Sequence, residues 1–317
     1  MDPVTATARP RVGLLGNPSD GYGGRVIAFT FDDFAAAVTV RARRDGGDDP
    51  VSVDLMDAAV TVFTEHAESV GAGPAVLDQR DARHDYVMSL ASDIPRQVGF
   101  AGSSAIVIAA LRALSRWFAM PVDPVTLARL ALWAETRVLG IQAGPQDRVV
   151  QAHGGVFDMD FATSEWGVTP LDVDLIPPLL LAWTRSPGAS SGGVHDDIKQ
   201  RFDAGDPAVI AAMDVFPQLA REGALCLSGG DLEGLRALVD RNFDQRATIW
   251  TLDAQDLAMV ELGRRHGAAV KFCGSGGGVV AVPESVDDLD VLERVYADAG
   301  FAILRPTVTR GGTAGGT

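Results

Sequence analysis

The chain has little cysteine, a shortage of positive charge and no long apolar run. Only two of its 317 residues are cysteines, Cys226 and Cys273, and they form no metal-ligand spacing, which favours a reducing compartment over a disulfide framework. Lys and Arg number 27 against 42 Asp and Glu, a net charge of −15, which disfavours binding of nucleic acid or anionic membrane through a broad basic face. No apolar run approaches the roughly 18 residues of a membrane span. We therefore expect a cytoplasmic protein with neither kind of partner, either a monomer or a homodimer.

The commonest nucleotide-binding signatures are also absent. The sequence contains no G-x-x-x-x-G-K-[ST] and no complete G-x-G-x-x-G. Its composition is that of an ordinary globular protein, with 47% hydrophobic and 22% charged residues. The length is sufficient for a large core and for two lobes.

The order of elements predicts an α+β fold. Residues 1–10 read as a loose leader. Short β-branched runs bounded by Gly, Asn and Asp then predict strands at 11–16, 25–31, 35–43 and 51–55. Helical patterns follow at 57–70, 103–118, 121–140, 194–221, 228–243 and 289–300. We expect lobes at residues 1–185 and 186–317, a flexible stretch at 186–193 and a disordered tail at 311–317.

A glycine and serine turn leads into the helix predicted at 103–118. In GFAGSSAIVIAALRAL, residues 99–104 are small and are followed directly by apolar residues at helical spacing. Backbone N–H groups at a helix start bind phosphate well, and small residues allow a close approach. A capped core helix after a tight turn would have the same sequence.

Two further features carry possible chemistry. Glu135 lies near the end of a predicted helix, and Asp147 follows it in GPQDR. Two carboxylates can divide metal binding and acceptor activation in phosphoryl transfer, although most carboxylates are surface groups. Lys271 precedes GSGGG at 274–278. Such a loop serves either a left-handed turn or the close approach of a ligand.

Taken together and in this order, the motifs resemble those of the GHMP kinases, the superfamily of galactokinase, homoserine kinase, mevalonate kinase and phosphomevalonate kinase. RVGLLGNPSDGYGG is similar to the family's first motif, with Arg11 and Asp20 in register. GFAGSSA resembles the phosphate loop G-L-G-S-S-A with one extra residue, and KFCGSGGG resembles the closing glycine motif. The glucuronokinase branch is the nearest likeness, through LGIQAGPQDRVVQAHGG, FDMDF, LIPPL and NFD as well as the longer loop.

The resemblance implies a two-lobed kinase that uses ATP and Mg²⁺, with its active site between the lobes. It implies Asp147 as the carboxylate at the acceptor hydroxyl, with Arg11 near it, and Glu135 and Ser104 as Mg²⁺ ligands. The residues expected to bind ATP are Gly99, Ala101, Gly102, Ser103, Ser104, Gly274, Ser275, Gly276 and Gly277. The residues expected to contact the acceptor are Asn17 and Asp20, with Arg25 and Arg148 as candidates for its carboxylate or for structural ion pairs.

The activity implied is transfer of the ATP γ-phosphate to the anomeric hydroxyl of D-glucuronate. NPSD replaces the E-H-x-D run of galactokinase, so galactose is not the acceptor that we expect. Galacturonate, another sugar or mevalonate remains open as the acceptor, because a few side chains select the substrate in one fold. A non-catalytic ligand sensor is disfavoured because both carboxylates are present.

Overall fold

Residues 2–43, 53–72, 85–185 and 192–311 are described by a computed structural model, which divides into two units. Unit 1 comprises Met1–Pro10, Phe34–Ile94 and Ala101–His153. Unit 2 comprises Arg11–Asp33, Pro95–Phe100 and Gly154–Thr317. These units are interleaved along the sequence, whereas the division at residue 185 predicted above is contiguous. That division stays a prediction.

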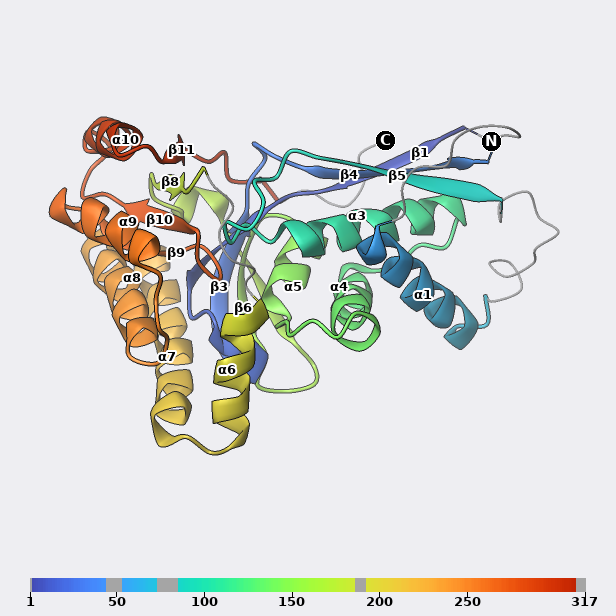
Figure 1. Cartoon of the computed structure of the whole chain (residues 1–317), viewed down its shortest axis with the longest axis horizontal. Helices are drawn as coiled ribbons and strands as arrows, with labels where there is room; N and C mark the ends of the chain where they lie inside the picture. The colour runs from blue at the N-terminus through green and yellow to red at the C-terminus, as the bar shows by residue number, and fades with distance from the viewer. Residues whose placement is uncertain (1, 44–52, 73–84, 186–191, 312–317) are drawn as a thin grey trace. The chain divides into compact units, whose positions relative to one another are not determined.

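Unit 1 is built on a three-stranded antiparallel sheet with the order β1 (Val4–Ala8), β4 (Ala36–Ala42) and β5 (Tyr86–Ser92). Alternate residues of β4 are buried, as expected for a sheet with one covered face. The long helix α3 (Gly102–Trp117) lies along this sheet (Figure 1). Ten of its residues are buried, which explains why the sequence 103–118 reads as a nearly continuous apolar helix.

The described part of unit 1 also contains three further helices and a π-helical turn. They are α1 (Asp54–Ser69), α4 (Pro124–Trp133), the turn η3 (Ala134–Val138) and α5 (Gln146–His153). Helix α4 begins where the Asp123 carboxylate accepts from two first-turn N–H groups and proline occupies the first position. The π-helical turn continues α4 directly. Such turns insert an extra residue and are frequent at functional sites.

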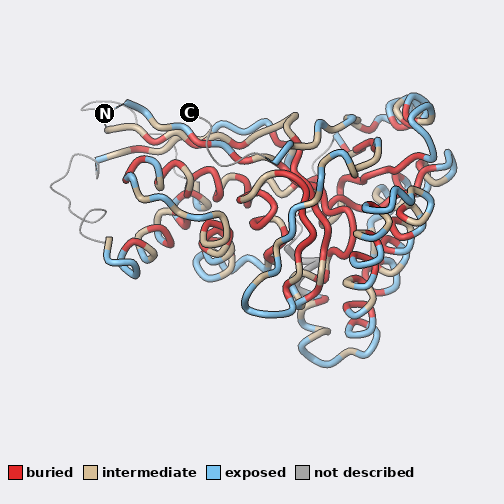
Figure 2. The backbone as a smooth tube through the Cα atoms, turned by 180° about the vertical axis from the view of Figure 1, so that it is seen from behind, coloured by how far each residue is buried: buried red, intermediate tan, exposed pale blue. Residues whose placement is uncertain are grey.

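Unit 2 contains two four-stranded antiparallel sheets. The first has the order β2 (Arg11–Leu15), β3 (Arg25–Thr30), β6 (Val156–Asp160) and β7 (Gly167–Leu171). The second has the order β11 (Ala302–Leu304), β8 (Leu180–Trp183), β10 (Gly278–Val282) and β9 (Ala269–Phe272). Strands β2, β9 and β10 are buried along their whole length, and this burial is visible in Figure 2. Such strands lack the alternation of a half-exposed sheet.

Helices cover both sheets of unit 2. They are α6 (Gly192–Asp203), α7 (Pro207–Gly229), α8 (Leu232–Ala247), α9 (Ala254–Arg265) and α10 (Leu289–Asp298), with 3-10 turns η1 (Ser19–Tyr22) and η4 (Val173–Leu175). Helix α7 contacts β2 and β3, while α8 and α9 contact β9. Among the described helices, none is long and apolar enough to cross a membrane.

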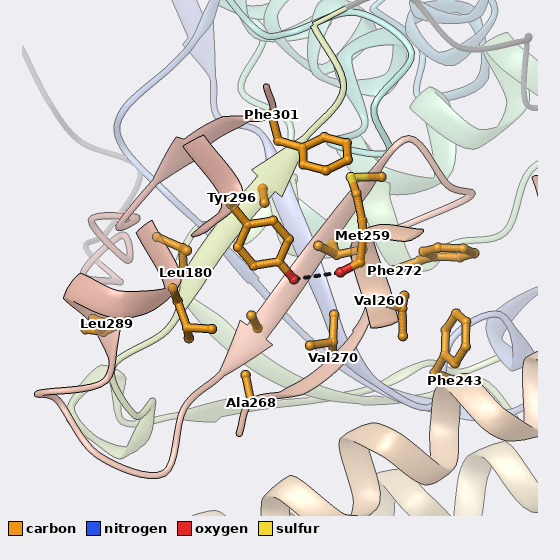
Figure 3. Packing of buried hydrophobic residues seen from close by; sticks show 14 residues of the cluster. Leu180, Phe243, Met259, Val260, Ala268, Val270, Phe272, Leu289, Tyr296 and Phe301 are labelled. Carbon is orange, nitrogen blue, oxygen red and sulfur yellow. Dashed lines mark hydrogen bonds between the residues drawn. The ribbon is translucent and has the colours of Figure 1, made fainter. Parts of the chain in front are cut away.

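The core between β9, β10 and their helices is close-packed around aromatic side chains (Figure 3). The Tyr296 hydroxyl donates to the carbonyl oxygen of Met259 over 2.8 Å, which satisfies its polar group inside an apolar cluster. Phe243 and Phe272 meet edge to face, with ring centroids 5.3 Å apart. These contacts tie α8, α9 and α10 to one sheet.

Several sequence predictions are corrected at this level. Residues 1–10 are not a loose leader, because Val4–Ala8 forms β1 and pairs with β4. The strand predicted at 51–55 is wrong where it is described, since Asp54 begins α1. The helix predicted at 194–221 is two helices, broken before Pro207, which starts α7. The flexible stretch and the tail fall largely at 186–191 and 312–317, outside the described residues.

Gly263 offers a test of how tightly this core is packed. A Cβ atom there would lie 2.4 Å from Tyr296 Oη and 2.6 Å from Val270 Cγ2. We expect Gly263→Ala to lower the free energy of unfolding by about 1–3 kcal/mol through overpacking, despite the better helix propensity of alanine. Gly229→Ala is the matched control, because nothing lies within 4 Å of the added atom. Chemical denaturation measures both; equal stability of the two variants would contradict this packing.

Candidate functional site

The edge of β2 that does not pair with β3 bonds two glycine-containing loops of unit 2, one ending at residue 100 and one beginning at residue 273. The Arg11 N–H donates to Phe100 O over 3.2 Å, and the Gly13 N–H donates to Cys273 O over 2.8 Å. These N–H groups point the same way because residues two apart on a strand share an edge. A bulge between Gly13 and Leu15 interrupts the register with β3. The chain around residue 100 and the chain around residue 273 are thus attached to one strand.

The glycines of these two loops are needed for their close approach. A Cβ atom on Gly274 would lie 2.5 Å from Gly99 O, and one on Gly99 would lie 2.9 Å from Gly276 O. Gly276 and Gly277 also have positive φ angles of 138° and 76°, which residues other than glycine rarely adopt. The backbones of the predicted phosphate loop and of the third glycine motif therefore pack directly on each other.

Charged side chains of α8 and α9 form hydrogen bonds with the main chain of the glycine loop at 274–277. Arg246 of α8 is buried and donates to Gly274 O over 2.9 Å and to Ser275 O over 3.0 Å. The Asp256 carboxylate of α9 accepts from the Gly277 N–H at 3.0 and 3.1 Å. Burial lowers the pKa of Arg246 to about 10 and raises the pKa of Asp256. One cation and one anion therefore fix successive peptide groups of the loop.

Arg11 joins the two loops through its side chain. Its guanidinium donates to Gly99 O and, over 3.4 Å, to Cys273 O. The resemblance expects Arg11 near Asp147. Arg11 belongs to unit 2 and Asp147 to unit 1, so their pairing stays a prediction.

Asn17 and Asp20, the predicted acceptor contacts, lie just after β2. Asn17 is buried, and its Oδ1 accepts from Lys271 Nζ over 2.8 Å. Asn242 of α8 secures the main chain on either side: its Oδ1 accepts from the Gly16 N–H over 2.7 Å, and its Nδ2 donates to Asn17 O over 3.1 Å. Asp20 lies in the turn η1. The first motif is therefore held by α8 and β9.

Lys271 is a fully buried lysine in β9. Burial lowers its pKa to about 7, with Arg246 and Arg11 acting in the same direction and Cys273 opposing them. The unfolded chain retains this proton up to the ordinary lysine pKa of 10.5. Unfolding between these pH values therefore takes up a proton, and this group makes stability rise with pH across that window.

In unit 1, helix α3 begins without a side-chain cap. Its N-cap is Ala101, a non-glycine residue in the left-handed region with φ 60° and ψ 45°. The hydroxyl of Ser104 donates back to Ala101 O over 3.1 Å. Ser103 and Ser104 occupy the first turn, as predicted, but neither is the N-cap. The first-turn N–H groups receive no acceptor from a capping side chain, an arrangement that suits an anion.

Arg148 lies between the two predicted functional carboxylates. Its Nε donates to Glu135 Oε2 over 2.6 Å and its Nη2 donates to the same oxygen. Its Nη1 donates to Gly144 O over 2.8 Å and lies 3.6 Å from Asp147 Oδ2. The Glu135 side chain is 1% exposed and that of Asp147 is 18% exposed. A guanidinium between two carboxylates reduces their mutual repulsion.

Glu135 retains an unused oxygen. Among the described residues, its Oε1 is buried without a hydrogen-bond partner. A buried carboxylate oxygen left in this state costs free energy unless a cation or donor completes it. The residue lies in the π-helical turn η3, directly after α4.

Arg25, the other candidate for a substrate carboxylate, is engaged within unit 2. Its Nε donates to Asp158 Oδ1 over 2.7 Å and its Nη2 to Asp158 Oδ2, a bidentate pair between β3 and β6. The pair raises the pKa of Arg25 further. Arg25 and Arg148 therefore both form ion pairs inside their own units, the alternative that the sequence left open.

The predicted residues fall into two sets. Unit 2 holds Arg11, Asn17, Asp20, Arg25, Gly99, Gly274, Ser275, Gly276 and Gly277. Unit 1 holds Ala101, Gly102, Ser103, Ser104, Glu135, Asp147 and Arg148. Sequence reasoning missed Arg246 and Asp256, whose helices carry many exposed charges; for Asn242 the only signal was the NFD run.

Comparison with known proteins decides the family. The model for the GHMP kinases N terminal domain matches residues 58–155. Two proteins of Arabidopsis thaliana, named probable glucuronokinase 2 and glucuronokinase 1, are each 35% identical over 92% of this chain and 88% and 89% of their own lengths. The chain belongs to the GHMP kinase family. It is a small-molecule kinase similar to the glucuronokinases, and GHMP kinases use ATP.

Solved structures confirm the α+β fold of a GHMP kinase. The galactokinase of Lactococcus lactis, complexed with galactose, superposes with a TM-score of 0.75 at 15% identity and covers 98% of this chain and 94% of its own. The mevalonate kinase of Methanococcus jannaschii gives a TM-score of 0.72 at 13% identity, with 98% of both chains covered. At such identities the likeness concerns the fold alone.

The two cysteines of this kinase should differ sharply in reactivity. Cys273 is fully buried beside the third glycine motif, and burial raises its pKa to about 12, whereas Cys226 is only partly buried. Because the thiolate is the reactive form, we expect one modified thiol in the native protein and two after denaturation. Thiol counting with a chromogenic disulfide reagent measures this. Cys226→Ser should leave none reactive in the native state; rapid modification of Cys273 would contradict its burial.

Proposed function

We propose that this GHMP kinase is a glucuronokinase, which transfers the γ-phosphate of ATP to the anomeric 1-hydroxyl of D-glucuronate and yields glucuronate 1-phosphate. The observation that carries the proposal is the 35% identity to two glucuronokinases over 92% of the chain. The matched length argues that the acceptor-selecting segments are included as well as the shared motifs.

The first motif supports a non-galactose acceptor. Where galactokinases have E-H-x-D, this chain has Asn17, Pro18, Ser19 and Asp20. Asn17 is held by Lys271 and Asn242, and Ser19 donates to Gly16 O over 2.8 Å. The side chain proposed to contact the sugar is therefore a neutral amide in a fixed position.

Asp147 is proposed to receive the proton of the acceptor hydroxyl. In that step the bond from the γ-phosphorus to the leaving oxygen of ADP breaks, and a bond from it to the sugar oxygen forms. Asp147 is partly exposed, accepts from Gln146 Nε2 over 3.0 Å and lies beside Arg148. These contacts fix the direction of its carboxylate, which is what an orienting base requires.

Glu135 and Ser104 are proposed to hold Mg²⁺, which when bound with ATP offsets the negative charge of the phosphates. The unpartnered Oε1 of Glu135 fits this role, and the buried Ser104 hydroxyl keeps lone pairs free after donating to Ala101 O. The described residues contain no cluster of three His, Cys, Asp or Glu side chains suited to a metal. The carboxylate of Glu135 and the hydroxyl of Ser104 together fit Mg²⁺, which is often held by one or two carboxylates together with substrate phosphates and water.

An acceptor panel tests the activity and the base together. We expect ADP release with D-glucuronate to exceed that with D-galacturonate, D-galactose, D-glucose and mevalonate. Asp147→Asn should lower kcat by about 10²–10⁴-fold, because the amide cannot take the proton. Asp298→Asn, an exposed carboxylate at the end of α10, is the control.

The outcomes of that panel separate the possibilities. Preference for another acceptor would reject glucuronate and keep the kinase. Full turnover by Asp147→Asn would reject the assigned base. ATP binding without turnover on any acceptor would favour a sensor.

Glu135→Gln tests the proposed metal ligand. We expect the Mg²⁺ concentration for half-maximal activity to rise about tenfold or more, because an amide oxygen replaces an anionic one. The control Glu65→Gln removes an exposed carboxylate of α1 and should leave this Mg²⁺ concentration unchanged.

Because Glu135 also pairs with Arg148, the thermal stability of Glu135→Gln should be measured beside its kinetics. Binding of Mn²⁺ with a non-hydrolysable ATP analogue, followed by electron paramagnetic resonance, gives a readout apart from turnover; wild-type affinity in Glu135→Gln would overturn the assignment.

A further inference from the structure

Lys271 is an ionisable side chain of unit 2 to which the proposed reaction gives no task. It lies in β9, is 2% exposed and donates three hydrogen bonds. The acceptors are Gly13 O at 2.6 Å, Phe272 O at 2.7 Å and Asn17 Oδ1 at 2.8 Å. An ammonium has three N–H donors and no acceptor, so these bonds use its full capacity.

None of these three acceptors is a carboxylate. The charged and titratable groups around Lys271 are Arg11, Arg246 and Cys273, and both arginines disfavour its ammonium form. Burying a cation among oxygens that carry no charge is costly. Packing alone is better served by an apolar side chain of similar length. The bonds of Lys271 therefore point to a task in positioning.

The bond to Asn17 fixes which way its amide lies. Because an ammonium only donates, the atom of Asn17 that faces Lys271 must be the oxygen. The Asn17 Nδ2, on the other side of the planar amide, is then presented as a donor. Gly13 makes room for this arrangement, since a Cβ atom there would lie 3.0 Å from Asn17 Cγ.

We propose that Lys271 is a positioning residue that holds the Asn17 amide with its NH₂ group toward the acceptor substrate, so that Asn17 donates to a substrate oxygen. The inference rests on the proposed function, because the contact between Asn17 and the acceptor comes from it. Lys271 itself touches no substrate in this arrangement. Asn242 completes the support by fixing the peptide groups of Gly16 and Asn17.

A double-mutant cycle tests whether Lys271 acts through Asn17. We expect Lys271→Met to raise the KM for the acceptor about tenfold, the value of one well-formed hydrogen bond, with the KM for ATP changed less than twofold. In an Asn17→Ala background the same substitution should change the acceptor KM less than twofold, because nothing remains to be oriented. Multiplicative effects, or equal changes in both KM values, would overturn the inference. Circular dichroism and thermal unfolding verify that each variant is folded.

The pH dependence gives a second readout that a merely structural role would not produce. As pH rises above about 7, Lys271 loses its proton and one donor. The acceptor KM of the wild type should then rise, and this rise should be missing in Lys271→Met. Asn17→Asp gives Lys271 a carboxylate partner and should move its titration to higher pH. A wild-type pH profile retained in Lys271→Met would overturn the inference.

A measurement without turnover separates this inference from the proposed function. The side-chain amide resonances of Asn17, followed by ¹⁵N nuclear magnetic resonance, should shift as Lys271 titrates in the wild type and stay constant in Lys271→Met. A flat titration in both would reject the positioning role. If the wild type phosphorylates another acceptor than glucuronate, the proposed function fails and the cycle is run with that acceptor. If glucuronate is phosphorylated but the cycle is additive, the function stands and the positioning role is rejected.

Discussion

The outward edge of β2 is the constraint on which unit 2 depends. A buried strand edge presents N–H and C=O groups that must be paired. Here the N–H groups of Arg11 and Gly13 bond to Phe100 O and Cys273 O, and Gly13 O bonds to Lys271 Nζ. The strand's own hydrogen bonds therefore fix where both glycine loops lie. The small residues at Gly99 and Gly274 follow from this, because two backbones attached to one edge must pass close to each other.

Buried cations in unit 2 bear on how an acidic chain binds an anionic nucleotide. The net charge of −15 opposes the approach of ATP. In unit 2, Arg11, Arg246 and Lys271 are buried and donate to main-chain carbonyl oxygens. A cation bound by carbonyl dipoles keeps its net charge, whereas one paired with a carboxylate does not. Arg11 and Arg246, and Lys271 while it is protonated, therefore bring positive charge close to the glycine loops, which the Asp256 carboxylate offsets in part.

The sequence was sufficient for structural features that are local in the chain. Glycine at positive φ and an apolar helix after a small-residue loop are both visible in a single stretch of sequence. The roles of Arg246 and Asp256 were not, because their burial arises when α8 and α9 pack against β9. Strand β1 was missed although VTATA alternates, since alanine gives little contrast in hydrophobicity. The placement of Arg148 between Glu135 and Asp147 likewise depends on how α5 and η3 meet.

That placement also gives the two carboxylates of one short segment different environments. Arg148 donates two hydrogen bonds to a single oxygen of Glu135, and the other oxygen has no partner among the described residues. Its Nη1 lies near Asp147, which keeps some exposure to solvent. The buried carboxylate is thus suited to hold a cation, and the more exposed one to exchange a proton with an incoming hydroxyl. Arg148, which the sequence offered either for a substrate carboxylate or for a structural ion pair, contacts both of these carboxylates.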